Sequence, residues 1–297
     1  MDPGQRKRMQ IIHAVKEMKS FADAARGAGK RIAFVPTMGY FHDGHLDLMR
    51  EARRRADWVV VSIYVNPTQF GPREDLDTYP RDFERDRRLA EGVGVDVIFF
   101  PDNSEMYPPG YQTYVDVEGV TRNLCGRSRP GHFRGVTTVC AKLFNIVKPQ
   151  VTVFGTKDFQ QLAAIKRMVT DLNMDLDVVG RPTTREADGL AMSSRNVHLC
   201  AAERPSALSL SRSLQMAERR FQEGERDAAT VIRDIRTFIE GHPFVSVDYI
   251  QICDSQTLED VPDISEGAVL AMAVRVGKTR LIDNHVFGEA LNLSKGH

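Results

Sequence analysis

The segment RIAFVPTMGYFHDGH, residues 31–45, says more about the fold than any other stretch of the chain. Residues 32–36 are apolar without alternation, which is typical of a strand covered on both faces, as in a parallel sheet. The following residues, PTMGYFHDGH, lie where this strand ends and a helix begins. The segment therefore predicts a strand–turn–helix unit of an α/β fold.

Similar apolar runs, each bounded by turn residues, recur at 57–65, 95–100, 151–155 and 174–180. Between them, residues 45–56 and 136–148 place apolar side chains at the helical period. This alternation of strand and helix predicts a doubly wound, Rossmann-like parallel sheet over residues 1–183. We expect this first domain to be the catalytic one.

The sequence changes character after residue 183. A helical stretch rich in Ser, Arg and Ala is followed by short apolar runs at 245–252, 268–276 and 279–284. This pattern predicts a smaller α+β domain with an antiparallel sheet at residues 184–297, with the boundary near residues 182–186. We expect this domain to carry the MSSRN loop at 192–196 and to cover the active site of the first domain.

Composition narrows the class of protein. The 297 residues are 42% hydrophobic and 27% charged, and 40 Lys plus Arg balance 40 Asp plus Glu, so no excess of positive charge favours a nucleic acid. The N-terminus has basic residues without the apolar stretch of a signal peptide, and no window is apolar enough to cross a bilayer. We therefore expect a cytoplasmic protein with a small-molecule substrate and no membrane partner.

The four cysteines form no CxxC pair, which argues against a zinc site or a redox dithiol. They are Cys125, Cys140, Cys200 and Cys253. We expect them to be buried or idle thiols.

His42 and His45 are the strongest candidates for chemistry. They lie three residues apart at a predicted helix start, where N–H groups and the positive end of the helix dipole favour phosphates. Gly39 and Gly44 would let the backbone and a nucleotide approach closely, and the two imidazoles could donate hydrogen bonds to the phosphates. Two His at this spacing also suit a metal pair or a partly exposed surface, and the residues alone leave these alternatives open.

The HxGH pattern resembles the signature of the nucleotidyltransferase superfamily, which is shared with class I aminoacyl-tRNA synthetases. Those enzymes have a second, basic motif of the KMSKS type. Here the candidate is Met192-Ser193-Ser194-Arg195, whose hydroxyls and guanidinium could wrap a triphosphate.

Further segments resemble pantothenate synthetases, in the same order from about residue 10 to residue 284. They are VSIYVNPTQFGPREDLDTYPRD (61–82), GHFRGVTTVCAKLFNIVKP (131–149), VFGTKDFQQLAAIKRMVTDLN (153–173), TTREADGLAMSSRN (183–196) and AVRVGKTRLIDN (273–284). One departure is visible at Thr156, where the family commonly has Glu. This order of segments is more specific than any single motif.

The resemblance implies that residues 1–183 form an ATP- and pantoate-binding catalytic domain, and it implies roles for individual residues. The groups implied to stabilise phosphate charge are His42, His45, Lys157, Ser193, Ser194 and Arg195. The wider ATP site adds Pro36, Thr37, Met38, Gly39, Phe154, Gly155, Asp158 and Met192. Pantoate would contact Met38, Asn66, Gln69, Arg134 and Gln161, and magnesium would lie near Asp86.

Three of these assignments have alternatives. Asp158 would touch the ribose or orient Lys157. Arg134 suits an anion contact or a structural salt bridge, and Asp86 suits an ordinary solvated helix carboxylate as well as a magnesium ligand.

The implied reaction is an ATP-dependent condensation of pantoate with β-alanine through a pantoyl adenylate, catalysed by a homodimer. Three alternatives compete with it: a nucleotidyltransferase acting on another small acid or phosphate, a tRNA-charging enzyme, and a non-catalytic nucleotide-binding module. The short chain without net positive charge argues against tRNA charging.

Overall fold

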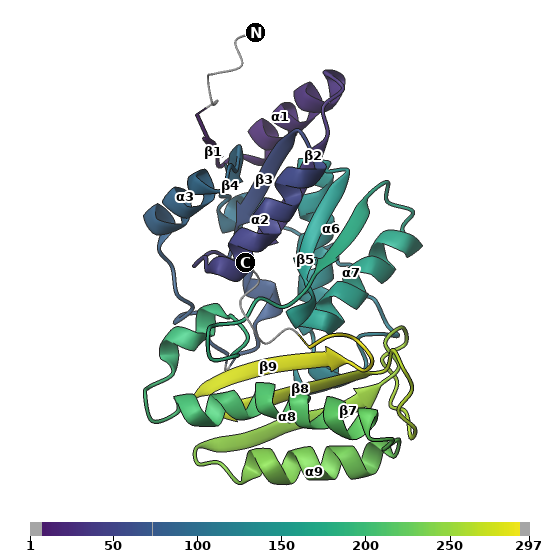
Figure 1. The fold of residues 1–297 in the computed structure, drawn as a ribbon. Coiled ribbons are helices and arrows are strands. Elements are labelled where there is room, and N and C mark those ends of the chain that lie inside the picture. Colours follow the sequence, from purple (N-terminus) through teal and green to yellow (C-terminus); the bar gives the residue numbers. More distant parts are fainter. Residues whose placement is uncertain (1–7, 73, 292–297) are drawn as a thin grey trace. The chain divides into compact units, whose positions relative to one another are not determined.

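The computed structural model describes residues 8–72 and 74–291, and it divides into two compact units (Figure 1). Residues 1–7, part of the N-terminus considered above for a signal peptide, lie outside the described residues, as do Arg73 and residues 292–297. Unit 1 comprises Met1–Asp116, Phe133–Gly155 and Ile165–Arg181, and unit 2 comprises Val117–His132, Thr156–Ala164 and Pro182–His297. The functional domains expected at 1–183 and 184–297 stay a prediction; the units differ from them because two segments before residue 165 group with unit 2.

In the described part of unit 1, six parallel strands form one sheet in the order β1-β4-β3-β2-β5-β6. The strands are β1 (Gln10–Ile12), β2 (Ile32–Thr37), β3 (Trp58–Ile63), β4 (Val97–Phe99), β5 (Val151–Gly155) and β6 (Asp177–Arg181). The predicted doubly wound sheet is therefore confirmed. The order reverses between β2 and β5, and in such sheets ligands bind outside the carboxyl ends of the strands at this switch point.

Strand β1 was not predicted, so the strand that leads into the HxGH turn is the second of the chain and not the first. Only one of the three β1 side chains, Ile12, is buried. Such a short strand produces no apolar run that a sequence pattern could reveal.

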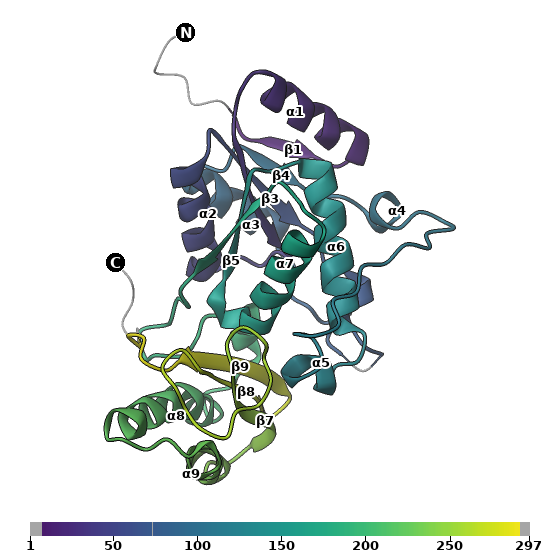
Figure 2. The ribbon, with the colours of Figure 1, turned by 90° about the vertical axis from the view of Figure 1, so that its right-hand side faces the viewer.

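Helices cover both faces of this sheet (Figure 2). They are α1 (Val15–Gly27), α2 (Asp43–Arg55), α3 (Phe83–Gly92), α6 (His132–Val147) and the part of α7 (Phe159–Asp171) that belongs to unit 1, residues 165–171. The short α4 (Asn103–Met106) follows β4. On one face, Leu46, Met49 and Ala52 of α2 pack in a common apolar cluster with the strands and with α3. On the other face, Phe144 of α6 meets Phe34 of β2 edge-on at 6.3 Å. Burial on both faces explains why the strands read as continuous apolar runs.

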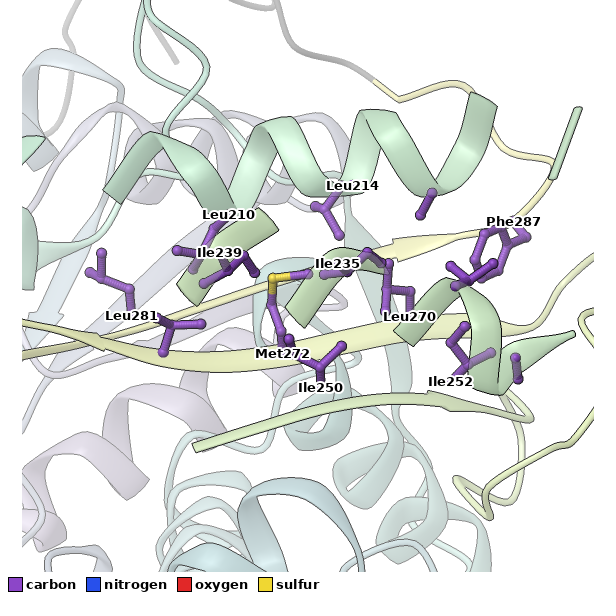
Figure 3. Packing of buried hydrophobic residues seen from close by; sticks show 14 of the residues in the cluster. Leu210, Leu214, Ile235, Ile239, Ile250, Ile252, Leu270, Met272, Leu281 and Phe287 are labelled. Carbon is purple, nitrogen blue, oxygen red and sulfur yellow. The ribbon is translucent and has the colours of Figure 1, made fainter. Parts of the chain in front are cut away.

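Unit 2 contains the predicted antiparallel sheet, in the order β7-β8-β9. Its main elements are β7 (Val245–Cys253), β8 (Val269–Val276), β9 (Thr279–Val286), α8 (Arg204–Gln222) and α9 (Ala228–Glu240), with the short α5 (Leu124–Ser128). Helices α8 and α9 pack on one face, where their Leu and Ile side chains meet those of the strands (Figure 3). Among the helices that the structure describes, none combines the length and apolar character needed to cross a membrane.

Candidate active site

The turn between β2 and α2 is shaped by Thr37, Gly39 and Tyr40. Thr37 Oγ1 donates to the Ser62 carbonyl on β3 (2.6 Å) and accepts the Gly39 N–H (3.2 Å). Gly39 and Tyr40 both have positive φ, 85° and 54°, so the chain bends sharply within two residues. A Cβ on Gly39 would lie 3.0 Å from Oδ2 of Asp86. A side chain of the protein therefore fills the space beside Gly39 that a Cβ would need.

Asp86, in the first turn of α3, holds this bend in place. Its Oδ2 accepts the N–H of Tyr40 at 2.6 Å and its Oδ1 accepts the N–H of Phe41 at 2.7 Å. The side chain is 1% exposed. Burial raises the pKa of the carboxyl group, although the two N–H donors oppose the rise. Asp86 therefore ties the N-terminus of α3 to the turn that precedes α2.

These contacts do not fit the magnesium ligand expected at Asp86, because both of its oxygens are engaged by backbone N–H groups and the carboxylate is buried. Among residues 8–72 and 74–291, no group of three or more His, Cys, Asp or Glu side chains gathers as a metal site. A magnesium ion that accompanies ATP is commonly held largely by the phosphates and water. We therefore assign no protein ligand to it.

His42 and His45 lie at the start of α2, as expected from the sequence. His42 precedes the first helical residue, and its carbonyl accepts the His45 N–H at 2.8 Å. The centres of the two rings are 4.1 Å apart, and the backbone N–H of His42 donates to His45 Nδ1 at 3.4 Å. Since Nδ1 accepts, the proton of a neutral His45 ring belongs on Nε2. His45 can therefore present an N–H donor to a phosphate oxygen at a helix N-terminus.

Three residues predicted to contact pantoate lie together after β3 and β2. Asn66 caps the short turn η1 (Pro67–Gln69), and its Nδ2 donates to Gln69 Oε1 at 3.1 Å. Gln69 Nε2 lies 3.4 Å from the sulfur of Met38. Arg134, in the first turn of α6, places its guanidinium 4.1 Å from the centre of the Tyr114 ring. This stacking differs from both roles expected for Arg134, an anion contact and a structural salt bridge.

In unit 2, Lys157 and Asp158 belong to the turn η2 (Thr156–Asp158). Their side chains approach to 3.5 Å, in agreement with the alternative that Asp158 orients Lys157. Asn284 of β9 donates from Nδ2 to the carbonyls of Thr156 (3.0 Å) and Lys157 (2.7 Å). Because Asn284 uses backbone carbonyls, the unusual Thr156 side chain does not affect this contact. Gln161 lies in the first turn of α7 and is half-buried.

The MSSRN segment of unit 2 is anchored by a buried ion pair. The backbone of Arg185 forms an isolated antiparallel β-bridge with Ala191. Its guanidinium makes a bidentate contact with Asp283 of β9, at 2.7 and 2.9 Å. Both side chains are at most 3% exposed. Asn196 donates to Glu186 and to the Ala191 carbonyl. The adjacent β9 residues Asp283 and Asn284 thus hold the two segments of unit 2 that carry the predicted phosphate-contacting side chains.

Within that segment, Ser193 Oγ accepts the Arg195 N–H at 3.3 Å and caps the turn η3 (Ser194–His198). Ser194 is buried, whereas Met192 and Arg195 are half-buried. In unit 1, Phe154 is buried in β5. Adenosine contacts of Met192 and Phe154 remain predictions.

Of the cysteines, Cys125, Cys140 and Cys253 are buried and Cys200 is exposed, and all four are free thiols. None of them is itself a predicted phosphate or pantoate contact, although Cys140 lies on α6, the helix that carries Arg134.

A doubly wound α/β unit with a His pair at the helix N-terminus beside the switch point defines the HxGH nucleotide-binding class. Residues 10–286 match the family model described as pantoate-beta-alanine ligase. The chain belongs to this family.

Solved and curated relatives agree with this membership. The chain is 67% identical to the pantothenate synthetase of Syntrophus aciditrophicus, over 96% of this chain and all of the relative. It is similar to a solved pantothenate synthetase from Thermus thermophilus, with 45% identity, a TM-score of 0.89 and coverage of 94% and 99% of the two chains. A Francisella tularensis pantoate-beta-alanine ligase, described as complexed with Beta-gamma ATP and Beta-alanine, has 31% identity, a TM-score of 0.80 and coverage of 96% and 100%.

The sequence located the HxGH turn, the η1 turn and both loops of unit 2, but it missed the residues that hold them. Asp283 and Asn284 lie in the segment AVRVGKTRLIDN, where the sequence predicts no role for them. For Asp86 the sequence predicts a magnesium ligand and not a residue that holds a turn. Only the long-range family segment could have drawn attention to Asn284, because its partners are more than 120 residues earlier in the chain.

Proposed function

We propose that this chain condenses pantoate with β-alanine at the expense of ATP, releasing AMP and pyrophosphate. The observation that carries the proposal is the match of residues 10–286 to the pantoate-beta-alanine ligase family. A carboxylate resists attack by an amine because oxide would have to leave, so the acid must first be activated.

Activation follows from the chemistry of the substrates. A carboxylate oxygen of pantoate attacks the α-phosphorus of ATP, the bond to the β-phosphate breaks, and pyrophosphate leaves. The neutral amine of β-alanine then attacks the acyl carbon of the pantoyl adenylate. AMP departs with the bonding electron pair, and the amine loses a proton as the amide forms.

In unit 1 we assign His42 and His45 to the phosphates and Gln69, with Asn66 and Met38, to pantoate. The His45 Nε2–H donor and the α2 N-terminus support the first assignment, since both favour oxyanions. The carboxamide of Gln69 can bond a hydroxyl or a carboxylate without adding charge.

In unit 2 we assign Lys157, Ser193, Ser194 and Arg195 to phosphate charge and Gln161 to pantoate. Lys157 keeps only 18% of its side chain exposed, and Asn284 fixes its backbone, which supports a preorganised cation and not a freely moving one. We assign no covalent nucleophile, so catalysis relies on positioning and on charge stabilisation.

We further propose that the enzyme is a cytoplasmic homodimer that uses magnesium bound to the ATP phosphates, and that residues 1–183 and 184–297 act as its catalytic and covering domains. The homodimer and the magnesium ion rest on the family resemblance, and the division into domains rests on the change of sequence pattern after residue 183.

Exchange of labelled pyrophosphate into ATP tests the function. We expect exchange in the presence of pantoate and in the absence of β-alanine, because the adenylate forms before the amine attacks. In the same assay, Lys157→Ala and His45→Ala should each slow exchange by about 10²–10³-fold, as for loss of one preorganised oxyanion donor. Exchange that required β-alanine would refute the adenylate, and exchange supported only by another acid or phosphate would favour a different HxGH nucleotidyltransferase.

A further inference from the structure

The environment of Asn66 in unit 1 defines the orientation of its amide. Asn66 Oδ1 accepts hydrogen bonds from three donors: the Tyr107 hydroxyl (3.0 Å), the Thr68 hydroxyl (3.0 Å) and the Thr68 N–H (3.4 Å). Its Nδ2 donates to the carbonyl of Gly135 (3.1 Å). The Thr68 N–H can only donate and the Gly135 carbonyl can only accept, so an amide rotated by 180° would oppose both groups, and only one orientation satisfies the network. Asn66 is 1% exposed, which makes an unsatisfied polar atom costly.

The orientation of Asn66 determines that of Gln69. Asn66 Nδ2 also donates to Gln69 Oε1 at 3.1 Å, so the carbonyl end of the Gln69 amide faces Asn66. The NH₂ end then lies on the other side, where Nε2 is 3.4 Å from Met38 Sδ. Gln69 therefore presents the donor end of its amide on the side of Met38, and such a donor matches the carboxylate or hydroxyl oxygens of pantoate.

We propose that Tyr107 is a positioning residue for pantoate, acting through Asn66 to present Gln69 as a hydrogen-bond donor. This inference rests on the proposed function, because it takes Gln69 as a pantoate contact. Tyr107 follows α4 and lies about 40 residues after η1, so the contact depends on the fold of unit 1.

The surroundings of Tyr107 keep its hydroxyl available as a donor. Burial raises the pKa of Tyr107 to about 12, so the phenol keeps its proton throughout the range in which the enzyme would be assayed. The ring meets Tyr111 edge-on at 5.0 Å, and the ammonium of Lys142 lies 5.6 Å from its centre. These packed neighbours limit the movement of the ring without using the hydroxyl that bonds Asn66.

Tyr107→Phe tests the proposal, because it removes the hydroxyl and keeps the ring. We expect the KM for pantoate in the exchange assay to rise by about 3- to 10-fold, as for loss of one hydrogen bond, with little change in the KM for ATP. The matched control is Tyr64→Phe. Tyr64 is a neighbouring buried tyrosine at 6.5 Å whose hydroxyl donates to Asn103 and not to Asn66, so its loss should leave the KM for pantoate unchanged.

A double-mutant cycle separates positioning from a general structural effect. In the Gln69→Ala background, Tyr107→Phe should cause no further loss of pantoate affinity, because the residue through which it acts is gone. An equal effect of Tyr107→Phe with and without Gln69, or a parallel rise in both KM values, would overturn the proposal. If Gln69→Ala itself left pantoate use intact, the pantoate assignment of Gln69 would fail instead.

Discussion

At the scale of single residues, Asp86 shows how a buried carboxylate can hold a turn that leads to candidate phosphate-contacting residues. The N–H groups of Tyr40 and Phe41 point at its two oxygens, and Tyr40 has a positive φ that a non-glycine residue adopts at a cost. The two hydrogen bonds offset this cost. The conformation of the turn that leads to His42 and His45 therefore depends on a helix that lies later in the chain.

Asp86→Asn should distort this turn, because the amide can accept only one of the two N–H groups and turns its own NH₂ toward the other. We expect a loss of about 1.5–3 kcal/mol in the free energy of unfolding, as for hydrogen bonds to a charged group, together with weaker ATP binding. Urea unfolding and calorimetric titration with ATP measure the two effects.

The control is Asp82→Asn, the same change at the cap of the same helix. Asp82 accepts the Arg85 N–H at 3.0 Å at an exposed position, and Asn is an equally good capping residue. This variant should keep wild-type stability and ATP affinity. ATP affinity in Asp86→Asn equal to that of Asp82→Asn would remove Asp86 from the turn-holding role.

At the scale of elements, the close packing of α6 on η1 in unit 1 depends on Gly135. A Cβ at this position would lie 2.5 Å from the carbonyl oxygen of Thr68 and 2.7 Å from the Cα of Gln69. Both contacts are with backbone, which cannot swing aside as a side chain can. The glycine thus lets the helix support the turn that carries Gln69, and its own carbonyl accepts a hydrogen bond from the side-chain Nδ2 of Asn66.

Gly135→Ala should therefore displace η1 and weaken pantoate use by about 10-fold or more, since a small misplacement of a binding group is costly. Gly92→Ala, at the end of α3, provides the matched control, because a Cβ there meets nothing within 4 Å. We expect that variant to be neutral or up to about 1 kcal/mol more stable. The KM for pantoate in both variants, with circular dichroism to verify the fold, decides the point. Equal KM values would show that η1 can move to accommodate the added methyl group without affecting the use of pantoate.

At the scale of the whole molecule, both units bury groups that lose protons at alkaline pH. Burial raises the pKa of Cys140 to about 12 and that of Tyr107 to about 12 in unit 1. In unit 2, burial and a hydrogen bond to Asp260 raise the pKa of Cys253 to about 12. These groups keep their protons in the folded chain at a pH at which the unfolded chain has released them.

The sign of the effect follows from proton linkage. Above about pH 9 the unfolded state binds fewer protons than the folded state, so stability falls as pH rises, by about 1.4 kcal/mol per pH unit for each group that is charged only when unfolded. Urea unfolding between pH 8 and 11 should show this decline. Cys140→Ala should make the slope shallower by about one proton, whereas Cys200→Ala, at an exposed position, should not change it. A slope unaffected by Cys140→Ala would contradict the prediction.

Local chemistry predicted the HxGH turn and, apart from β1, the strands of both sheets, because helix starts and burial on two faces leave patterns in consecutive residues. The other segments with polar candidates followed from the family resemblance. Neither source could show that Asp86 bonds Tyr40, that Tyr107 orients Asn66, or that Arg185 pairs with Asp283. The partners in these pairs are 46, 41 and 98 residues apart. A hydrogen bond between such distant residues depends on the strand order and on how each helix packs, and a local sequence pattern determines neither. The tertiary structure alone therefore decided which side chains hold the candidate residues in place.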